Sequence, residues 1–348
     1  MKAAINNIRR KLMNSLTSNV GERMIVRRDF SLSSNLPKRI LVVRPNSRLG
    51  NQLMLTPLLQ EIEALLPGCK IDLFVRGNLA PILFANYQQV DRITKLPPKP
   101  FKELKKYLNT WVSLRKYHYD LVFNVDSGSS SGRLCTKWVR GKAKYFGDRY
   151  EQMNNKDATH MAKWPVYNFR WFLSQLGIAE NIQPPQPLSL KLTDFEKQNG
   201  EQLLKKMLGN DKPTIMFYTF ATGEKCLSKE WWKPFFAQLR QRYGENYNLL
   251  EVLPKENVSQ IDFDSLNYYS TDIREMGAVM HSGKVFITGD CGVMHLASSV
   301  GIPTIALFSG DNIRTYEPYN QGSASFLTDE VTLEELIACI DSIIPYSK

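Results

Sequence analysis

Residues suited to binding a charged group gather in one turn of the segment VFITGDCGVMHLASSVGIPTIALF (285–308). The turn follows an apolar run and contains Asp290, Cys291, Gly292 and His295. Glycine lets the backbone approach a ligand, and the first amides of a following helix are donors at its positive end. These groups predict a diphosphate site to which His295 donates a further hydrogen bond. In the alternative interpretation, Asp290 caps the helix and His295 packs inside the domain.

A second turn, in FYTFATGEKCLSKEWWKPFFAQL (217–239), is a polar loop between an apolar run and a helical pattern. A lysine above a strand end can neutralise a leaving phosphate as a compact charge. Lys225 is our candidate for that role and Lys229 is the runner-up, while Thr222 is a further phosphate ligand from the same loop. The alternative is a solvated surface lysine, the usual environment of this residue.

Strand-like runs alternate with helical patterns on both sides of the proline-rich stretch IQPPQPLSL (182–190). This alternation predicts an α/β protein with two Rossmann-like parallel-sheet domains, whose ligands bind at the carboxyl ends of the strands. We expect an N-terminal extension and linker over 1–37, one domain over 38–185, and a second over 186–348 with a C-terminal helix. The expected strands cover 39–44, 71–75, 92–96, 120–125, 214–219, 248–253, 285–288 and 303–308. The expected helices cover 52–66, where Pro57 interrupts the pattern, and 101–117, 160–177, 192–208, 230–243, 271–282, 292–300 and 331–344.

The composition is that of a soluble globular protein, with 43% hydrophobic and 23% charged residues. The net charge of +11 favours anionic partners such as nucleic acid, phosphorylated sugars or an anionic membrane. The chain has no aromatic-basic motif of the kind that single-strand binders use, so we expect no nucleic-acid partner. Five scattered cysteines and four histidines form no CxxC or HExxH motif, which argues against a disulfide framework and a metal site. We expect no cofactor.

The first residues, MKAAINNIRRKL, have a positive start but no long apolar region or small-residue cleavage site, which predicts a cytoplasmic protein. Ile5, Ile8, Leu12 and Leu16 recur at helical spacing among basic residues. A short basic amphipathic helix with this pattern could bind peripherally to the anionic inner membrane, or its apolar stripe could pack on the protein itself.

The turn DCGVMHLASSVGIP resembles the signature of the bacterial heptosyltransferase family, glycosyltransferase family 9. Asp290, Gly292, His295 and Pro303 match this signature, while Cys291 occupies the position where the family usually has Thr. The resemblance covers about residues 38–325 and implies a GT-B fold, in which two Rossmann-like domains face each other across a cleft.

In this family, the signature turn binds the diphosphate and sugar of the donor. The family's phosphate-binding lysine, seven residues before an aromatic, corresponds to Lys225 and Trp232 here. Its glutamate on the nucleotide ribose corresponds to Glu256. The resemblance also matches Arg48 and Gly50, on the acceptor side, to the family's first glycine turn. It implies metal-independent, inverting displacement of a sugar, with ADP-heptose as donor and a lipopolysaccharide-type glycolipid or other cell-envelope glycan as acceptor.

One departure concerns the catalytic base. The family's heptose-transferring members usually carry Asp after the glycine, where this chain has Asn51, and an amide cannot take a proton from a hydroxyl at neutral pH. Either another carboxylate serves, or Asn51 only positions the acceptor, or the enzyme is impaired. Asp126, after the run DLVFNV, is the substitute base that we would test, with a loop cap as its alternative role. A catalytically silent nucleotide-sugar-binding protein remains the second hypothesis, and donor hydrolysis or transfer would separate the two.

Overall fold

The computed structural model describes residues 20–21, 24–28, 30, 32, 36–97, 103–147, 159–178 and 181–344. The expected N-terminal amphipathic helix lies outside these residues. The chain forms two compact units, and each is described by itself. Unit 1 draws on Met1–Ser47, Pro57–Thr159 and Lys163–Gln186, and unit 2 on Arg48–Thr56, His160–Ala162 and Pro187–Lys348. Two short segments from the first half of the sequence therefore group with unit 2.

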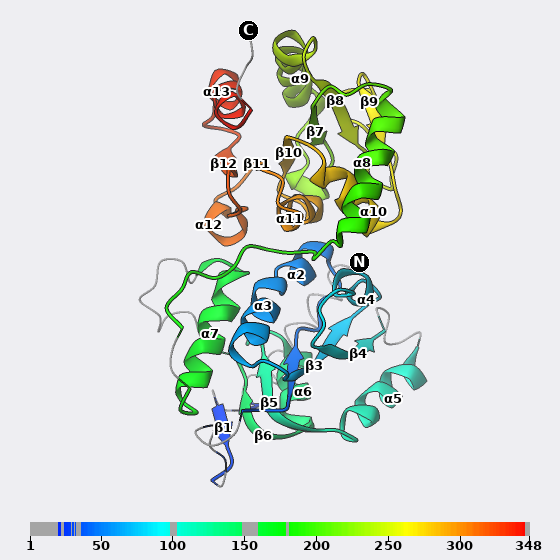
Figure 1. Cartoon of the computed structure of the whole chain (residues 1–348). Helices are drawn as coiled ribbons and strands as arrows, with labels where there is room; N and C mark the ends of the chain where they lie inside the picture. The colour runs from blue at the N-terminus through cyan, green and yellow to red at the C-terminus, as the bar shows by residue number, and fades with distance from the viewer. Residues whose placement is uncertain are drawn as a thin grey trace. The chain divides into compact units, whose positions relative to one another are not determined.

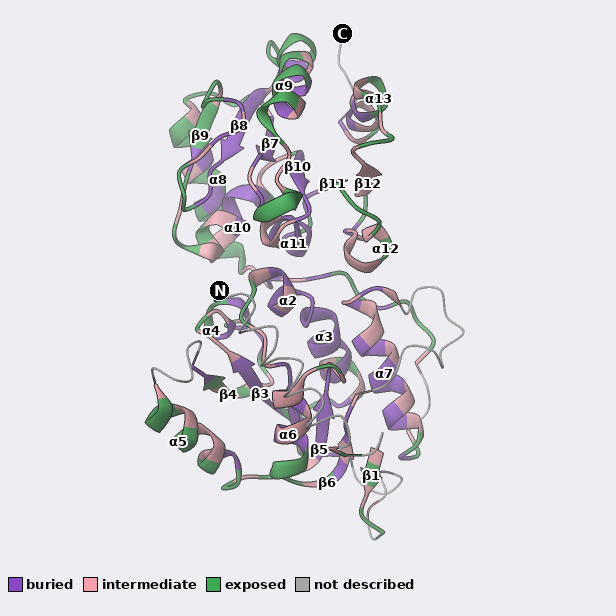
Figure 2. Ribbon diagram, turned by 180° about the vertical axis from the view of Figure 1, so that it is seen from behind, coloured by how far each residue is buried: buried purple, intermediate pink, exposed green. Residues whose placement is uncertain are grey.

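Unit 1 contains a six-stranded sheet in the order β1-β6-β5-β2-β3-β4 (Figure 1). Its strands pair in parallel, except that the edge strand β1 runs antiparallel to β6. The central strands are almost continuously buried, as expected for a parallel sheet covered on both faces (Figure 2). The strands are β1 (Met24–Val26), β2 (Arg39–Val43), β3 (Lys70–Arg76), β4 (Val90–Leu96), β5 (His118–Asn124) and β6 (Arg140–Tyr145). The helices are α3 (Thr56–Leu65), α4 (Ala80–Leu83), α5 (Leu104–Leu114), α6 (Ser130–Trp138) and α7 (Lys163–Ser174).

Unit 2 contains a second six-stranded, all-parallel sheet in the order β12-β11-β10-β7-β8-β9. Every residue of its four inner strands is buried. The strands are β7 (Thr214–Tyr218), β8 (Asn248–Val252), β9 (Leu266–Tyr268), β10 (Val285–Gly289), β11 (Thr304–Phe308) and β12 (Ala324–Leu327). The helices are α2 (Leu49–Leu53), α8 (Asp194–Leu208), the 3-10 turn η3 (Gly223–Lys225), α9 (Lys229–Tyr243), α10 (Ile273–His281), α11 (Gly292–Ser299), α12 (Ile313–Tyr316) and α13 (Leu333–Ile343).

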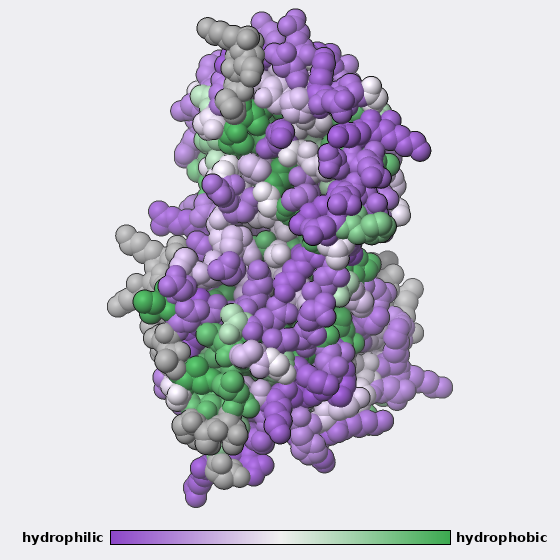
Figure 3. Space-filling view, viewed as in Figure 1, coloured by the Kyte–Doolittle hydropathy of each residue, from purple (hydrophilic) through white to green (hydrophobic). Residues whose placement is uncertain are grey.

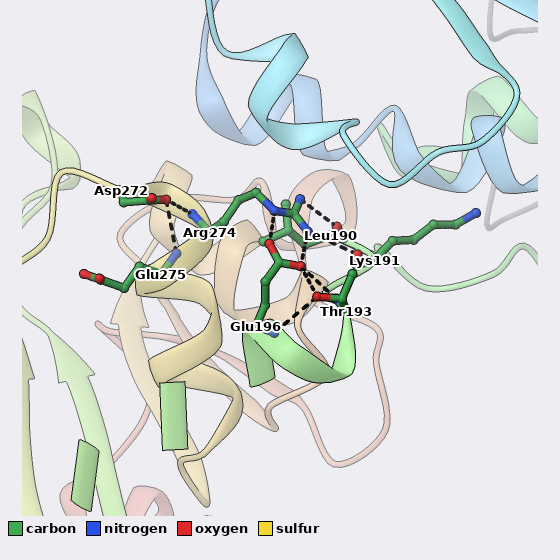
Figure 4. Close-up of polar contacts among 7 residues, drawn as sticks. All are labelled: Leu190, Lys191, Thr193, Glu196, Asp272, Arg274 and Glu275. Atoms are coloured by element: carbon green, nitrogen blue, oxygen red, sulfur yellow. Dashed lines mark hydrogen bonds and ion pairs between the residues drawn. The ribbon is translucent and has the colours of Figure 1, made fainter. Parts of the chain in front are cut away.

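The segment after the proline-rich stretch is fixed to unit 2 by one arginine (Figure 4). Arg274 on α10 donates to the backbone carbonyls of Leu190 (3.2 Å) and Lys191 (3.1 Å). Its guanidinium also forms a two-pronged pair with Glu196 on α8, with Nη2 2.9 Å from Oε2. Glu196 in turn completes a capping box with Thr193, which begins α8. Paired cation and amide donors hold the pKa of Glu196 at about 2.

The expected fold class, two Rossmann-like parallel-sheet α/β units, is confirmed, with one difference in the first helical pattern. The chain forms two helices there, because α2 ends at Leu53 and α3 begins at Thr56 with Pro57 in its first turn. Proline is favoured at a helix start, where its missing N–H would have no helical partner. The face drawn in Figure 3 carries mostly hydrophilic side chains. Among the described residues, every helix falls short of the length and apolarity needed to cross a bilayer.

Candidate active site

The turn with the signature residues lies at the carboxyl end of the central strand pair of unit 2. β7 is the first strand of this sheet; the chain continues to β8 on one side and returns to β10 on the other. Such a switch in strand order opens a crevice at the carboxyl ends of the two strands, where α/β sheets bind ligands. Asp290 directly follows β10, and Lys225 lies in the loop after β7. The sheet topology therefore brings two of the expected site residues together.

Lys225 and Asp290 form an ion pair in which the lysine is the exposed partner. Their side chains are 47% and 9% exposed, respectively. The carboxylate oxygen that accepts from Lys225, Oδ2 of Asp290, also accepts a hydrogen bond from the Asn312 Nδ2 (2.9 Å). The Lys225 ammonium also lies 5.5 Å from the centre of the Tyr316 ring. A buried aspartate thus orients a lysine that remains accessible to an anion.

Helix α11 begins directly beside this pair. Cys291 precedes its first residue in an extended conformation, and the Cys291 Sγ lies 3.5 Å from the Thr288 hydroxyl. Burial raises the pKa of the Cys291 thiol, although the hydroxyl and the first amides of α11 act in the opposite direction. The thiol is therefore protonated at neutral pH and adds no negative charge of its own to the helix start.

His295 lies in the first turns of α11 and is buried against α2. A methyl group at Gly50 would come within 2.5 Å of the His295 Cδ2, so only glycine allows this approach. On the opposite helix, a methyl group at Gly292 would meet the Leu49 Cβ at 3.3 Å. Burial lowers the pKa of His295 to about 4, so the ring is neutral near pH 7 and carries one N–H donor.

The loop after β8 carries Glu256, and hydrogen bonds centred on the buried carboxylate of Glu251 hold this loop in place. The Glu251 oxygens accept hydrogen bonds from the hydroxyls of Thr219 (2.6 Å) and Ser259 (2.7 Å). The Thr219 hydroxyl also accepts a hydrogen bond from the backbone N–H of Gln260. The Ser259 hydroxyl accepts hydrogen bonds from the backbone N–H groups of Ile261 and Phe263. Burial raises the pKa of Glu251. The Glu256 side chain itself is exposed.

Tyr218 lies near both this loop and the signature turn. It is the last residue of β7, and its pKa is raised first by burial and then by the nearby Cys291, Glu256 and Cys226. Thr222 is exposed and precedes the 3-10 turn that carries Lys225.

The corresponding position of unit 1 holds a second ion pair. β2 and β5 form the switch in strand order of this sheet, and Arg44 and Asp126 follow them. The Arg44 Nη1 lies 3.5 Å from the Asp126 Oδ2, and the side chains are 5% and 39% exposed. Asp126 also accepts the Gly128 amide (2.9 Å), so it caps its loop while one face remains open.

Arg48 and Asn51 belong to the segment Arg48–Thr56, which groups with unit 2. Arg48 precedes the first residue of α2 and is exposed, and Asn51 is half-buried one residue beyond Gly50. Asn51 and Asp126 thus lie in different units. Within unit 2, the structure brings together the signature turn, Lys225, His295 and Gly50.

Sequence reasoning missed several residues of this site: Tyr218, Glu251, Asn312 and Tyr316. Tyr218 and Glu251 had a signal, because they lie at or next to the carboxyl ends of expected strands. The contacts of Asn312 and Tyr316 depend on how the chain folds back after β11, which no local pattern indicated. In the described part of the chain, no group of three or more His, Cys, Asp or Glu side chains is arranged to hold a metal ion.

A parallel sheet whose central strands are followed by a lysine, a neutral imidazole and a helix start is typical of proteins that bind nucleotide diphosphates. Comparison with known proteins narrows this class. The model of glycosyltransferase family 9 (heptosyltransferase) matches residues 107–336. Lipopolysaccharide heptosyltransferase 3 of Escherichia coli is 23% identical over 298 residues, covering 80% of this chain and 84% of the relative.

Solved structures share the fold at lower sequence identity. A family 9 glycosyl transferase from Veillonella parvula has a TM-score of 0.70 and 16% identity, covering 89% of this chain and 98% of the other. The E. coli heptosyltransferase WaaC with ADP has a TM-score of 0.65 and 15% identity, covering 87% and 99%. The chain belongs to glycosyltransferase family 9 and has the GT-B fold of its heptosyltransferases. It is a glycosyltransferase.

Proposed function

We propose that this protein transfers a heptose from ADP-heptose to a lipopolysaccharide-type acceptor by direct displacement at the anomeric carbon. The observation that carries the proposal is the exposed Lys225, oriented by the buried Asp290 beside the start of α11. The names of its relatives support the sugar and the acceptor, since those relatives are lipopolysaccharide heptosyltransferases 2 and 3. The nucleotide is supported by WaaC structures with ADP and with ADP-2-deoxy-2-fluoro heptose.

Unit 2 is the donor-binding unit in this proposal. The Lys225 ammonium exchanges part of its contact with Asp290 for the leaving diphosphate, and the amides around Cys291 and Gly292 bind the same group. His295 donates its single N–H to a phosphate or sugar oxygen. These groups neutralise the leaving charge without a bridging metal.

The nucleoside and nearest phosphate contact the two loops after β7 and β8. A carboxylate can accept both hydroxyl protons of a ribose, and Glu256 presents an exposed one beyond the fixed Glu251 network. Thr222 adds a hydroxyl from the loop that carries Lys225.

Unit 1 is the acceptor-binding unit, and Asp126 is the base. Its outward carboxylate takes the proton of the acceptor hydroxyl as that oxygen attacks, which inverts the anomeric configuration. Arg44 stays beneath it and keeps the carboxylate aimed outward. From the segment Arg48–Thr56, which groups with unit 2, Asn51 accepts and donates hydrogen bonds that help position the acceptor, with Arg48 and Gly50 beside it.

Transfer is tested by incubating the protein with ADP-heptose and a heptose-deficient lipopolysaccharide core, followed by mass spectrometry. The expected product is the core plus one heptose, with release of ADP. UDP-glucose and GDP-mannose serve as matched donors. Equal transfer from all three would refute the assignment of ADP-heptose, and transfer from none would refute the proposed reaction with this acceptor.

A further inference from the structure

Helix α5 carries a row of apolar side chains that face solvent. Leu104, Leu108 and Val112 are 54%, 54% and 61% exposed, and their spacing of four residues places them along one side of the helix. The adjoining side of the helix packs inward through Tyr107, Trp111 and Leu114. Figure 2 shows exposed residues along the length of α5. The apolar surface of α5 is therefore wider than the part that the core covers, and the remaining part is exposed to solvent.

The apolar row continues onto the end of α6. Trp138 is also exposed, and its indole Nε1 donates to the Trp111 carbonyl (2.9 Å). The Arg115 guanidinium lies 4.7 Å from the centre of the Trp138 ring. We call the set Leu104, Leu108, Val112 and Trp138 the α5 patch.

The charges around the α5 patch are predominantly positive. Along residues 103–116 there are four basic side chains and a single acidic one, Glu103, which pairs with Lys106 (3.1 Å). Exposed basic residues also flank Trp138 in the sequence. The basic side chains are Lys105, Lys106, Arg115 and Lys116 on and after α5, and Lys137 and Arg140 beside Trp138.

We propose that the α5 patch is a docking surface for an anionic lipid bilayer. Aliphatic side chains and a tryptophan framed by lysine and arginine are the combination with which a helix lies in the headgroup region: the apolar groups enter the acyl boundary while the cations meet lipid phosphates. A protein partner with an acidic rim would match the charge as well, and in that case the wild type would not bind vesicles, which is one of the outcomes of the test. This surface is distinct from the N-terminal segment, and binding to it does not depend on the identity of the donor sugar.

The test measures co-sedimentation of the full chain with sucrose-loaded vesicles of phosphatidylglycerol and phosphatidylethanolamine, and with phosphatidylcholine vesicles. Wild type should bind the anionic vesicles, more weakly at high salt. The triple variant Leu104→Ser, Leu108→Ser, Val112→Ser should bind about tenfold more weakly, because it removes the inserting groups. The double variant Lys105→Gln, Lys116→Gln should lose affinity only for the anionic vesicles.

Matched controls come from helix α8. Phe195→Ser with Met207→Ser removes two exposed apolar side chains, and Lys205→Gln with Lys206→Gln removes two charges; both variants should bind as wild type does. Unchanged ADP binding and thermal stability of the triple variant would show that its fold is intact.

Three results would overturn the proposal: no binding by wild type, equal binding by the triple variant, or a wild-type dimer in light scattering that the triple variant dissolves. Binding abolished instead by Ile5→Ser with Ile8→Ser alone would assign the contact to the N-terminal segment. Vesicle binding alone decides this proposal. A variant that still binds ADP but no longer transfers sugar would bear on the proposed reaction and not on the membrane contact.

Discussion

The two sheets place the same kind of ion pair at the same position, with the burial reversed. In unit 1 the cation Arg44 is buried and the carboxylate of Asp126 faces outward. In unit 2 the carboxylate of Asp290 is buried and the ammonium of Lys225 faces outward. Both pairs follow the strands that flank a switch in strand order, so topology alone does not distinguish the two sites.

The difference lies in which ion can change partner. A buried ion is costly to leave unpaired, whereas an exposed one can exchange its partner for a ligand or for water. The outward ammonium of unit 2 suits an anion, and the outward carboxylate of unit 1 suits a hydroxyl. The same arrangement with opposite polarity thus suits the proposed donor site in unit 2 and the proposed acceptor site in unit 1.

The strongest test of this comparison is Asp126→Asn. If the outward carboxylate is the base, turnover should fall by about 10²- to 10⁴-fold while ADP affinity stays unchanged. Asp91→Asn is the control, because Asp91 pairs with Arg39 at the amino end of the same sheet. Steady-state transfer rates and calorimetry measure the two quantities. Equal turnover in wild type and Asp126→Asn would leave Asp126 as a loop cap.

A companion variant, Asn51→Asp, restores the carboxylate that the family usually has at this position. Increased turnover would mean that the native enzyme lacks its best base. No gain, together with a large loss in Asp126→Asn, would support the reversed-polarity interpretation.

Lys225→Ala tests the outward cation of unit 2. A hydrogen bond to a charged group contributes about 1.5–3 kcal/mol, so ADP affinity should fall about tenfold or more. Lys229→Ala is the matched control, since Lys229 is similarly exposed and pairs with Asp262. Isothermal titration with ADP decides, and equal affinities for all three proteins would remove Lys225 from the donor site.

Gly50→Ala tests whether α2 belongs functionally to unit 2. The added methyl group would collide with His295, and overpacking of this kind costs about 1–3 kcal/mol of stability. ADP affinity should fall as well, because His295 must shift. Gly310→Ala, where a methyl group meets no atom within 4 Å, is the control. Chemical denaturation and calorimetry showing no difference between the two variants would contradict the tight α2–α11 contact.

The smallest expected effect concerns Arg274 and acid stability. The pKa of Glu196 is lowered to about 2, so its pairing stabilises the fold above pH 4.5, the ordinary value, and this contribution is lost as the pH falls through about 2. Arg274→Met should cost about 1 kcal/mol at pH 7 and much less near pH 2. Lys205→Met, at an exposed pair with Glu201, should cost less at both. Unfolding free energies that differ equally at both pH values would show that the Arg274 cost comes instead from packing and from its hydrogen bonds to the Leu190 and Lys191 carbonyls.

Most of the parallel-sheet architecture could be predicted because buried parallel strands are short, nearly continuous apolar runs. The runs at β2, β7, β10 and β11 are of this kind. Three of the edge strands, β1, β9 and β12, were not predicted; β9, for example, is three residues long and mostly exposed. Helix α6 was also missed, because its sequence SSGRLCTKW has too few apolar residues to show helical spacing.

The parts of the candidate site that come from one continuous segment could be predicted. The parts that depend on contacts between distant residues could not. The turn from Asp290 to His295 is contiguous, so its glycine and helix start could be recognised. The orientation of Lys225 depends on Asp290, 65 residues further along the chain, and the exposure of Asp126 depends on a contact with Arg44. Such pairings are set by strand order, which the sequence does not state.

The grouping of α2 with unit 2 affects how this family could be recombined in the laboratory. A chimera that joins the chain from Pro187 onward to the first half of another family member by a single crossover would leave behind α2, the helix that packs against His295. The transplanted half would then bring its lysine and its signature turn without the glycine face that seats the imidazole. A functional exchange would have to carry Arg48–Thr56 and His160–Ala162 along with the C-terminal half. Unit 2 is built from three separate segments of the sequence, so no single crossover in the gene can transfer it whole.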